Sequence, residues 1–177
     1  MKTWMVKKMF CCFTGHRPQN LPENNEKSEY IVDLKETIAM QIEKAVNNGF
    51  FDFYTGMAQG IDTYAAEEVL KQRENDSRIK LHAAIPCEVQ ANSWSEEDKE
   101  RYHKILDKCE SVTYVSRHYY RGCMQQRNKF MVDNSEMVIA VWNGENTGGT
   151  AFTIKYASKQ GKEICLIRAN DLTVATL

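Results

Sequence analysis

Short apolar or β-branched runs alternate with amphipathic stretches along nearly the whole chain, and this alternation constrains the fold more than any other sequence feature. Runs of strand length lie at 5–14, 50–55, 79–85, 111–115, 137–142 and 163–167. Stretches with helical periodicity lie between them, at 31–48, 61–72, 95–109, 124–134 and 150–160. Strands that alternate with helices in this way predict an α/β protein with a mostly parallel sheet.

Two segments support this prediction most clearly. Ile31, Leu34 and Ile38 recur at three- and four-residue steps, as on the buried face of a helix. The run 137–142 is apolar at nearly every position, which is typical of a central parallel strand covered on both faces. We therefore expect one domain over 1–177, a doubly wound sheet of about six strands with helices on both faces, and a loose C-terminal tail.

Composition excludes several classes of protein. The 177 residues are 42% hydrophobic and 27% charged, which is ordinary globular usage. The 23 basic and 24 acidic residues give a net charge of −1, which disfavours nonspecific coating of nucleic acid. No run of about 18 apolar residues indicates a membrane span, and the N-terminus lacks the apolar core of a secretion signal.

Cysteine usage indicates a reducing compartment. The six cysteines include no Cys-x-x-Cys pair, and most lie inside apolar runs. We expect free thiols and a cytoplasmic location. His118 and Cys123 have no spacing typical of a metal site, so we expect no metal.

The chemistry of such a fold is expected where the strands end, because ligands bind beyond the carboxyl ends of parallel strands. Two of the segments that follow predicted strands, 55–62 and 143–150, are glycine-containing turns that lead directly into helices. Glycine allows close approach of a ligand to the backbone, and the first amides of a helix favour an anion. A tight turn also needs glycine for purely structural reasons, but two such turns with threonine neighbours favour a phosphate site.

Neither turn matches the Gly-x-Gly-x-x-Gly pattern or the P-loop, so a standard dinucleotide or ATPase site is disfavoured. Arg17 and Arg127 are candidate anion clamps, because a guanidinium group matches phosphate geometry. Asp62 is either a helix cap or a partner for a ribose hydroxyl. Trp94 and Tyr119 are candidates for stacking on a base, although packing is the commoner role for such aromatics.

The ligand-contacting residues that we predict lie at the strand ends and in the first turns of the helices. They are Thr14, Gly15, His16, Arg17, Thr55, Gly56, Met57, Ala58, Gly60, Asp62, Pro86, Arg127, Asn128, Gly148, Gly149 and Thr150. This hypothesis requires Gly15, Gly56 and Gly148 to lie on one rim of the molecule.

Several of these segments together resemble the SLOG superfamily, which is named from the Smf/DNA-processing A proteins and the Lonely Guy phosphoribohydrolases, and in particular its YpsA-like family. The resemblance rests on 14–18, 56–62, Trp94, 126–128 with 131–133, and 148–150, in consistent order along the chain. It implies a Rossmann-like fold that binds nucleotides or nucleotide-derived molecules.

The Lonely Guy branch cleaves the N-glycosidic bond of nucleoside 5′-monophosphates, and the sequence departs from its pattern in three ways. Asn128 follows Arg127 where that branch has lysine, the glycine loop lacks its proline, and Thr153 occupies the position of its glutamate. Glycosidic cleavage uses a carboxylate near the reacting carbon. Here that carboxylate would have to come from elsewhere; the candidates are Asp62, Glu88, Asp133 and Glu145.

The sequence therefore favours binding or sensing of a nucleotide-derived ligand, such as ADP-ribose, NAD or a nucleoside monophosphate, over hydrolysis. An N-glycosidase is the first alternative, and a single-stranded DNA-binding protein of the DNA-processing A type is the second. No cofactor is required by this interpretation, and neither nucleic acid nor a membrane is an expected partner. A homo-oligomer and a regulatory protein partner are left open.

Overall fold

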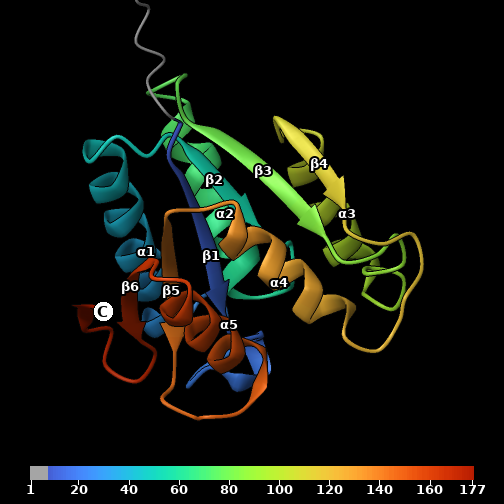
Figure 1. Cartoon of the computed structure of the whole chain (residues 1–177). Coiled ribbons are helices and arrows are strands. Elements are labelled where there is room, and N and C mark those ends of the chain that lie inside the picture. Colours follow the sequence, from blue (N-terminus) through green and yellow to red (C-terminus); the bar gives the residue numbers. More distant parts are fainter. Residues whose placement is uncertain (1–7) are drawn as a thin grey trace, which may run out of the picture.

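A computed structural model describes residues 8–177, and all of its strands belong to one seven-stranded sheet (Figure 1). The strand order is β4-β3-β2-β1-β5-β6-β7. Every neighbouring pair is parallel except β6 and β7, which are antiparallel. The strands are β1 (Phe10–Gly15), β2 (Asp52–Thr55), β3 (Lys80–Ile85), β4 (Ser111–Tyr114), β5 (Met137–Trp142), β6 (Glu163–Arg168) and β7 (Val174–Thr176).

Five α-helices cover the two faces of this sheet. They are α1 (Glu29–Asn47), α2 (Ile61–Arg73), α3 (Glu96–Leu106), α4 (Cys123–Asp133) and α5 (Gly148–Lys159), with a short 3-10 helix η1 at Pro18–Asn20. One cluster of buried side chains joins α1, α2 and α3 to the sheet, and a second joins α4 and α5 to its other face. The predicted α/β fold, with a mostly parallel sheet between two helical layers, is confirmed.

Local sequence chemistry sets the helix boundaries. The Ser28 hydroxyl accepts a hydrogen bond from the Ile31 N–H and caps α1, and the Ser95 hydroxyl accepts from the Asp98 N–H and caps α3. The end of α1 is fixed by Gly49, whose φ of +92° is a left-handed conformation that glycine adopts without strain.

The prediction of a loose C-terminal tail was wrong. The chain turns after Arg168 and returns as β7, which pairs with β6 through Leu166 and Ala175. The Asp171 carboxylate accepts hydrogen bonds from the N–H and the hydroxyl of Thr173, which fixes the turn. The run of three strand residues is too short for periodicity to reveal it. At the other end of the chain, positions 5–7 of the first predicted strand lie outside the described residues, and β1 itself begins at Phe10.

After β1 the chain adds β2, β3 and β4 in turn on one side of it. It then crosses back and places β5 on the other side of β1. The carboxyl ends of β1 and β5 therefore diverge into loops that leave in opposite directions. Such a switch point is where open α/β sheets bind ligands. Within residues 8–177 no helix is both long and apolar enough to cross a bilayer.

We expect Ile38→Ala to lower the free energy of unfolding by about 2–5 kcal/mol, because it leaves a cavity between α1 and the sheet. Met40→Ala is the matched control on the same helix, since Met40 is 63% exposed, and should change stability by less than about 0.5 kcal/mol. Urea denaturation of both variants would measure the difference. Equal effects at the two positions would contradict the assignment of the buried face of α1.

Candidate functional site

A cavity of about 390 Å³ lies at the switch point, beyond the carboxyl ends of β1 and β5. Its lining comes from the end of β1, the following turn, the start of α2, one side of α4 and the loop that opens α5. The lining residues are Phe13, Thr14, Gly15, His16, Arg17, Asn20, Ala58, Asp62, Met124, Arg127, Asn128, Glu145, Thr147, Gly148, Gly149 and Thr150.

The three glycines that the sequence places on one rim do lie at this end of the sheet. Gly15 and Gly148 line the cavity directly. Gly56 lies behind the wall, where its carbonyl oxygen accepts a hydrogen bond from Arg127 Nη1, and Arg127 itself lines the cavity.

Arg127 is the most unusual side chain of the site. It is only 5% exposed, and burial lowers the pKa of its guanidinium group below the usual value. Its two hydrogen bonds within the protein go to neutral oxygens, the Gly56 carbonyl and Asn128 Oδ1, the latter at 2.7 Å from Nε. A buried cation whose hydrogen-bond partners are neutral is costly to the fold, and the charge of Asp62 acts on this one without a direct ion pair.

Gly56 has to be glycine because the two charged groups of the site meet over its α-carbon. A β-carbon at this position would overlap the Arg127 guanidinium group and would lie 2.7 Å from Asp62 Oδ2. The glycine therefore allows the cation and the carboxylate to share one side of the turn.

The turn that carries Gly56 is held rigid by its own side chains. Thr55 Oγ1 accepts from the Met57 N–H at 3.1 Å and donates to the Asp62 carbonyl at 2.9 Å. Met57 is fully buried at a φ of +54°, and Gln90 Nε2 donates to its carbonyl oxygen at 2.9 Å. Thr55 and Met57 thus shape the wall from behind and do not line the cavity.

Asp62 is not the N-cap of α2, because Gly60 occupies that position. Its carboxylate Oδ2 instead accepts from the Ala58 N–H at 3.3 Å and so orients the turn, while its side chain lines the cavity. Burial raises the pKa of the Asp62 carboxyl above its usual value, and the nearby charge of Arg127 opposes this only in part.

His16 links the first turn to the loop after β5. Its Nε2 accepts from the Asn143 N–H at 3.1 Å, so in the neutral ring the proton is on Nδ1. Burial lowers the pKa of His16, which favours this neutral form. The backbone carbonyl of the same residue accepts from the Ile61 N–H at 3.3 Å, at the start of α2.

The start of α5 forms the third wall. Thr147 is its N-cap residue but makes no capping hydrogen bond through its side chain, and the first turn contains no acidic residue. Gly148 has a φ of +88°, which explains its identity, whereas Gly149 has no such constraint. A β-carbon at Gly149 would meet its nearest neighbour, Asn128 Nδ2, at an ordinary 3.9 Å.

Thr153, which occupies the position of the Lonely Guy glutamate, has a structural role. Its Oγ1 accepts from Asn128 Nδ2 at 2.9 Å and donates to the Gly149 carbonyl at 2.8 Å. The contact joins α4 to α5 and fixes the side-chain amide of Asn128. The oxygen of that amide accepts a hydrogen bond from Arg127 Nε.

Several other predicted residues lie elsewhere. Gly60 and Trp94 line a separate, smaller cavity of about 110 Å³, where the Trp94 ring packs edge-on against Tyr102 at a centroid distance of 5.4 Å. Pro86 is buried outside the lining of the switch-point cavity, and Tyr119 is 65% exposed on a loop.

The four candidate carboxylates are divided by the fold. Asp62 and Glu145 line the switch-point cavity, and Glu88 is an exposed loop residue outside its lining. Asp133 is the last residue of α4 and accepts a hydrogen bond from the Tyr156 hydroxyl at 2.8 Å. Of these four carboxylates, only Asp62 is both buried and part of the cavity lining.

Sequence reasoning missed four residues that also line the cavity, Phe13, Asn20, Met124 and Thr147. Met124 is three residues before Arg127 on the same helix, so helical spacing could have placed it on the same face. Asn20 belongs to the short 3-10 helix, for which the sequence carries no periodic signal.

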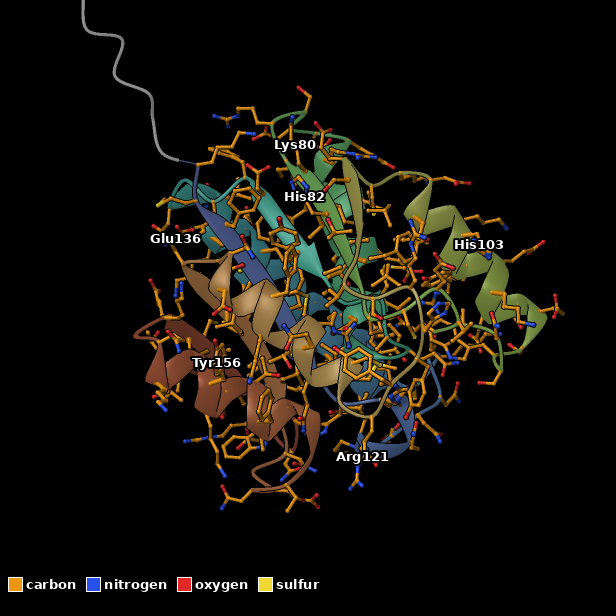
Figure 2. All side chains as sticks on the ribbon, turned by 45° about the vertical axis from the view of Figure 1, so that its right-hand side comes forward. Lys80, His82, His103, Arg121, Glu136 and Tyr156 are labelled. Atoms are coloured by element: carbon orange, nitrogen blue, oxygen red, sulfur yellow. The ribbon has the colours of Figure 1, made fainter. Side chains whose placement is uncertain are left out.

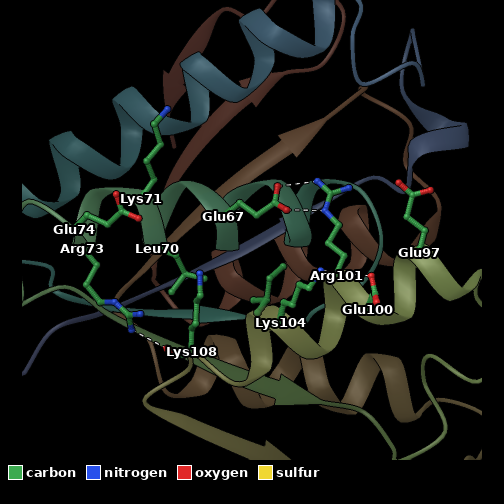
Figure 3. Close-up of a pocket in the computed structure, with 11 residues that line it drawn as sticks. Glu67, Leu70, Lys71, Arg73, Glu74, Glu97, Glu100, Arg101, Lys104 and Lys108 are labelled. Atoms are coloured by element: carbon green, nitrogen blue, oxygen red, sulfur yellow. Dashed lines mark hydrogen bonds and ion pairs between the residues drawn. The ribbon is translucent and has the colours of Figure 1, made fainter.

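A larger groove of about 680 Å³ lies between α2 and α3 but has a different character (Figure 3). Some of its basic side chains form ion pairs with acidic side chains of the same groove, as Arg101 does with Glu67 and Lys104 with Glu100. Arg101, for example, donates from Nε and Nη2 to the two carboxylate oxygens of Glu67 at 2.6 and 2.7 Å, and it also pairs with Glu26. Arg101 therefore has carboxylate partners in direct contact, whereas the hydrogen bonds of Arg127 within residues 8–177 go to neutral oxygens and Asp62 acts on it only through its charge.

Comparison with known proteins gives one consistent result. A sequence model described as the YspA SLOG family matches residues 11–172. A UPF0398 protein of Brevibacillus brevis is 25% identical over 174 residues, which cover 95% of this chain and 92% of the relative. A UPF0398 protein of Halalkalibacterium halodurans is 25% identical over 165 residues, covering 90% and 87%, and one of Ligilactobacillus salivarius is 24% identical over 152 residues, covering 85% and 83%.

We expect Gly56→Ala to destabilise the protein by about 1–3 kcal/mol, because the new methyl group displaces Arg127 or Asp62. Gly149→Ala is the matched control. It has room for the methyl group in the first turn of α5 and should stabilise the protein by up to about 1 kcal/mol. Thermal unfolding of both variants tests the difference, and a neutral Gly56→Ala would show that the guanidinium group does not occupy this position.

Proposed function

The chain belongs to the YspA SLOG family, and from that premise we propose that the switch-point cavity binds a nucleotide or nucleotide-derived ligand through its phosphate. The single observation that carries this proposal is the buried Arg127, whose hydrogen-bond partners are neutral and whose side chain lines the cavity. A phosphate oxygen would place in direct contact with this guanidinium group a negative charge that, within residues 8–177, Asp62 supplies only from a distance.

The start of α5 supports the same ligand chemistry. Its first backbone N–H groups have no capping side chain, and the adjacent Gly148 and Gly149 leave them uncovered. Unpaired amides at a helix N-terminus favour an anion. Because Gly149 is required neither by its φ nor by packing, close approach of a ligand to the backbone is the role that explains its identity.

The rest of the lining fits the remainder of a nucleotide. Arg17 adds a second cation at the rim, and the Asp62 carboxylate is an acceptor suited to a ribose hydroxyl. Phe13 and Met124 contribute the large apolar side chains, so we expect a base to pack on Met124 rather than on Trp94 or Tyr119. The volume of about 390 Å³ lies within the range of small-molecule sites and suits a nucleoside monophosphate or part of ADP-ribose or NAD.

We expect Arg127→Gln to weaken binding of such ligands by about 10- to 100-fold, because a hydrogen bond to a charged group contributes about 1.5–3 kcal/mol. Calorimetry with AMP, ADP-ribose and NAD would measure the affinities. Arg78→Gln is the control, since Arg78 is an exposed arginine paired with Asp76 before β3, outside the cavity lining. Failure of all three ligands to bind, or full affinity in Arg127→Gln with circular dichroism unchanged, would contradict the proposal.

An N-glycosidase is the second candidate, and Asp62 is the observation that favours it. A buried carboxyl in a cavity wall, with its pKa raised by burial, has the environment of a general acid or base. It would assist the departure of the base or activate the water that attacks the ribose carbon.

If the protein cleaves nucleoside monophosphates, Asp62→Asn should slow release of the free base by at least about 100-fold while the ligand still binds. Chromatographic detection of the base after incubation with each monophosphate gives the rate. Absence of any base release by the unmodified protein would reject the glycosidase and would leave the binding proposal to be decided by calorimetry alone.

A further inference from the structure

Three side chains form a hydrogen-bonded chain at the amino end of the sheet, away from the switch-point cavity. His82 Nε2 lies 2.8 Å from Asp52 Oδ1, and His82 Nδ1 lies 2.8 Å from Ser111 Oγ. The three residues come from β2, β3 and β4, where the register places Ser111 directly beside His82. Figure 2 shows His82 and Lys80 where β3 begins, and Arg121 on the opposite side of the molecule.

When the His82 ring is neutral and Asp52 is ionised, the chemistry of the three groups sets the direction of these hydrogen bonds. A carboxylate can only accept, so His82 donates its Nε2–H to Asp52. The Nδ1 of the neutral ring then carries a lone pair and accepts the hydroxyl proton of Ser111. This is the arrangement in which a histidine acts as the base for a serine and a carboxylate orients the histidine.

The three residues of this hydrogen-bonded set differ in burial. Asp52 and His82 are 5% and 7% exposed, whereas Ser111 is exposed at the edge of the sheet. Asp52 and His82 are therefore held among packed side chains, whereas Ser111 lies at the surface of the edge strand.

An aromatic surface borders the histidine. The Phe10 and Tyr54 rings stack at a centroid distance of 5.4 Å, and they lie 5.5 and 5.3 Å from the His82 ring. Phe130 of α4 packs edge-on against Tyr54 at 5.9 Å. These three aromatic side chains are each half-buried, and they pack beside His82 on the side of β3 that faces β2 and β1, away from Ser111 on β4.

We propose that Ser111 is an activated nucleophile that accepts the acyl group of small activated esters. Ser111 Oγ forms a bond to the acyl carbon, and its proton passes to His82 Nδ1. The bond between the acyl carbon and the leaving oxygen then breaks, and His82 returns the proton to that oxygen, which gives an acyl-serine and a free alcohol or phenol. Asp52 acts as a positioning residue for His82, and the Phe10 and Tyr54 rings pack against the His82 ring.

Incubation of the full chain with p-nitrophenyl butyrate tests the proposal by intact mass and peptide mapping. We expect one butyryl group per chain, located on Ser111, and no such group in Ser111→Ala. Ser158→Ala is the matched control, because Ser158 is an exposed serine with no hydrogen bond to a histidine in the part of the chain that the structure describes, and this variant should be acylated on Ser111 at the unmodified rate.

His82→Asn and Asp52→Asn should each slow acylation of Ser111 by about 100-fold or more, the first by removing the base and the second by favouring the wrong tautomer of the ring. Circular dichroism would show whether each variant is folded, and one folded variant of the two is enough for the test. Acylation spread over lysines and tyrosines with none on Ser111, or the same rate at Ser111 in a folded His82→Asn or Asp52→Asn variant, would overturn the proposal.

Discussion

The hydrogen bond from the Arg127 guanidinium group to the Gly56 carbonyl is the interaction on which the switch-point cavity depends. It joins α4, which follows β4 in the chain, to the turn after β2, and so connects two walls that the sheet alone would leave independent. The interaction needs a glycine at position 56. The turn is also held by the Thr55 hydroxyl, which accepts from the Met57 N–H, and by Gln90 Nε2, which donates to the Gly56 carbonyl. The fold thus holds a buried cation at a place where the cation contributes little to stability by itself.

The free-energy cost of this arrangement follows from the burial of both charged groups. Burial lowers the pKa of Arg127 and raises that of Asp62, so each charged form is disfavoured in the folded protein. For Asp62 the folded pKa lies above the unfolded one, so its contribution to stability is most favourable at low pH and is lost as the pH rises through the folded pKa. Two charges that weaken the fold near neutrality are what the proposed phosphate site would require.

The sequence predicted the alternation of strands and helices and the common location of the glycine turns, because periodicity and the parallel-sheet rule depend on residue order alone. It did not predict which way each side chain at a strand end would point. From the sequence, Thr55 and Met57 are expected to line the cavity together with Thr14 and Ala58. In the structure neither lines it; the Thr55 hydroxyl instead accepts a hydrogen bond from the Met57 N–H inside the turn. Trp94 was separated from the cavity by tertiary packing on Tyr102, which no local pattern specifies.

The residues at the two ends of the sheet also differ in whether they can be grouped from the sequence. At the carboxyl end, glycines and arginines occur in short segments that can be recognised one at a time. At the amino end, Asp52, His82 and Ser111 lie about 30 residues apart and meet only because β2, β3 and β4 are adjacent in a fixed register. The cavity instead uses the ends of β1 and β5, and within residues 8–177 no hydrogen bond joins its lining to Asp52, His82 or Ser111. A substitution in one group should therefore leave the geometry of the other intact, so the two proposals can be tested independently.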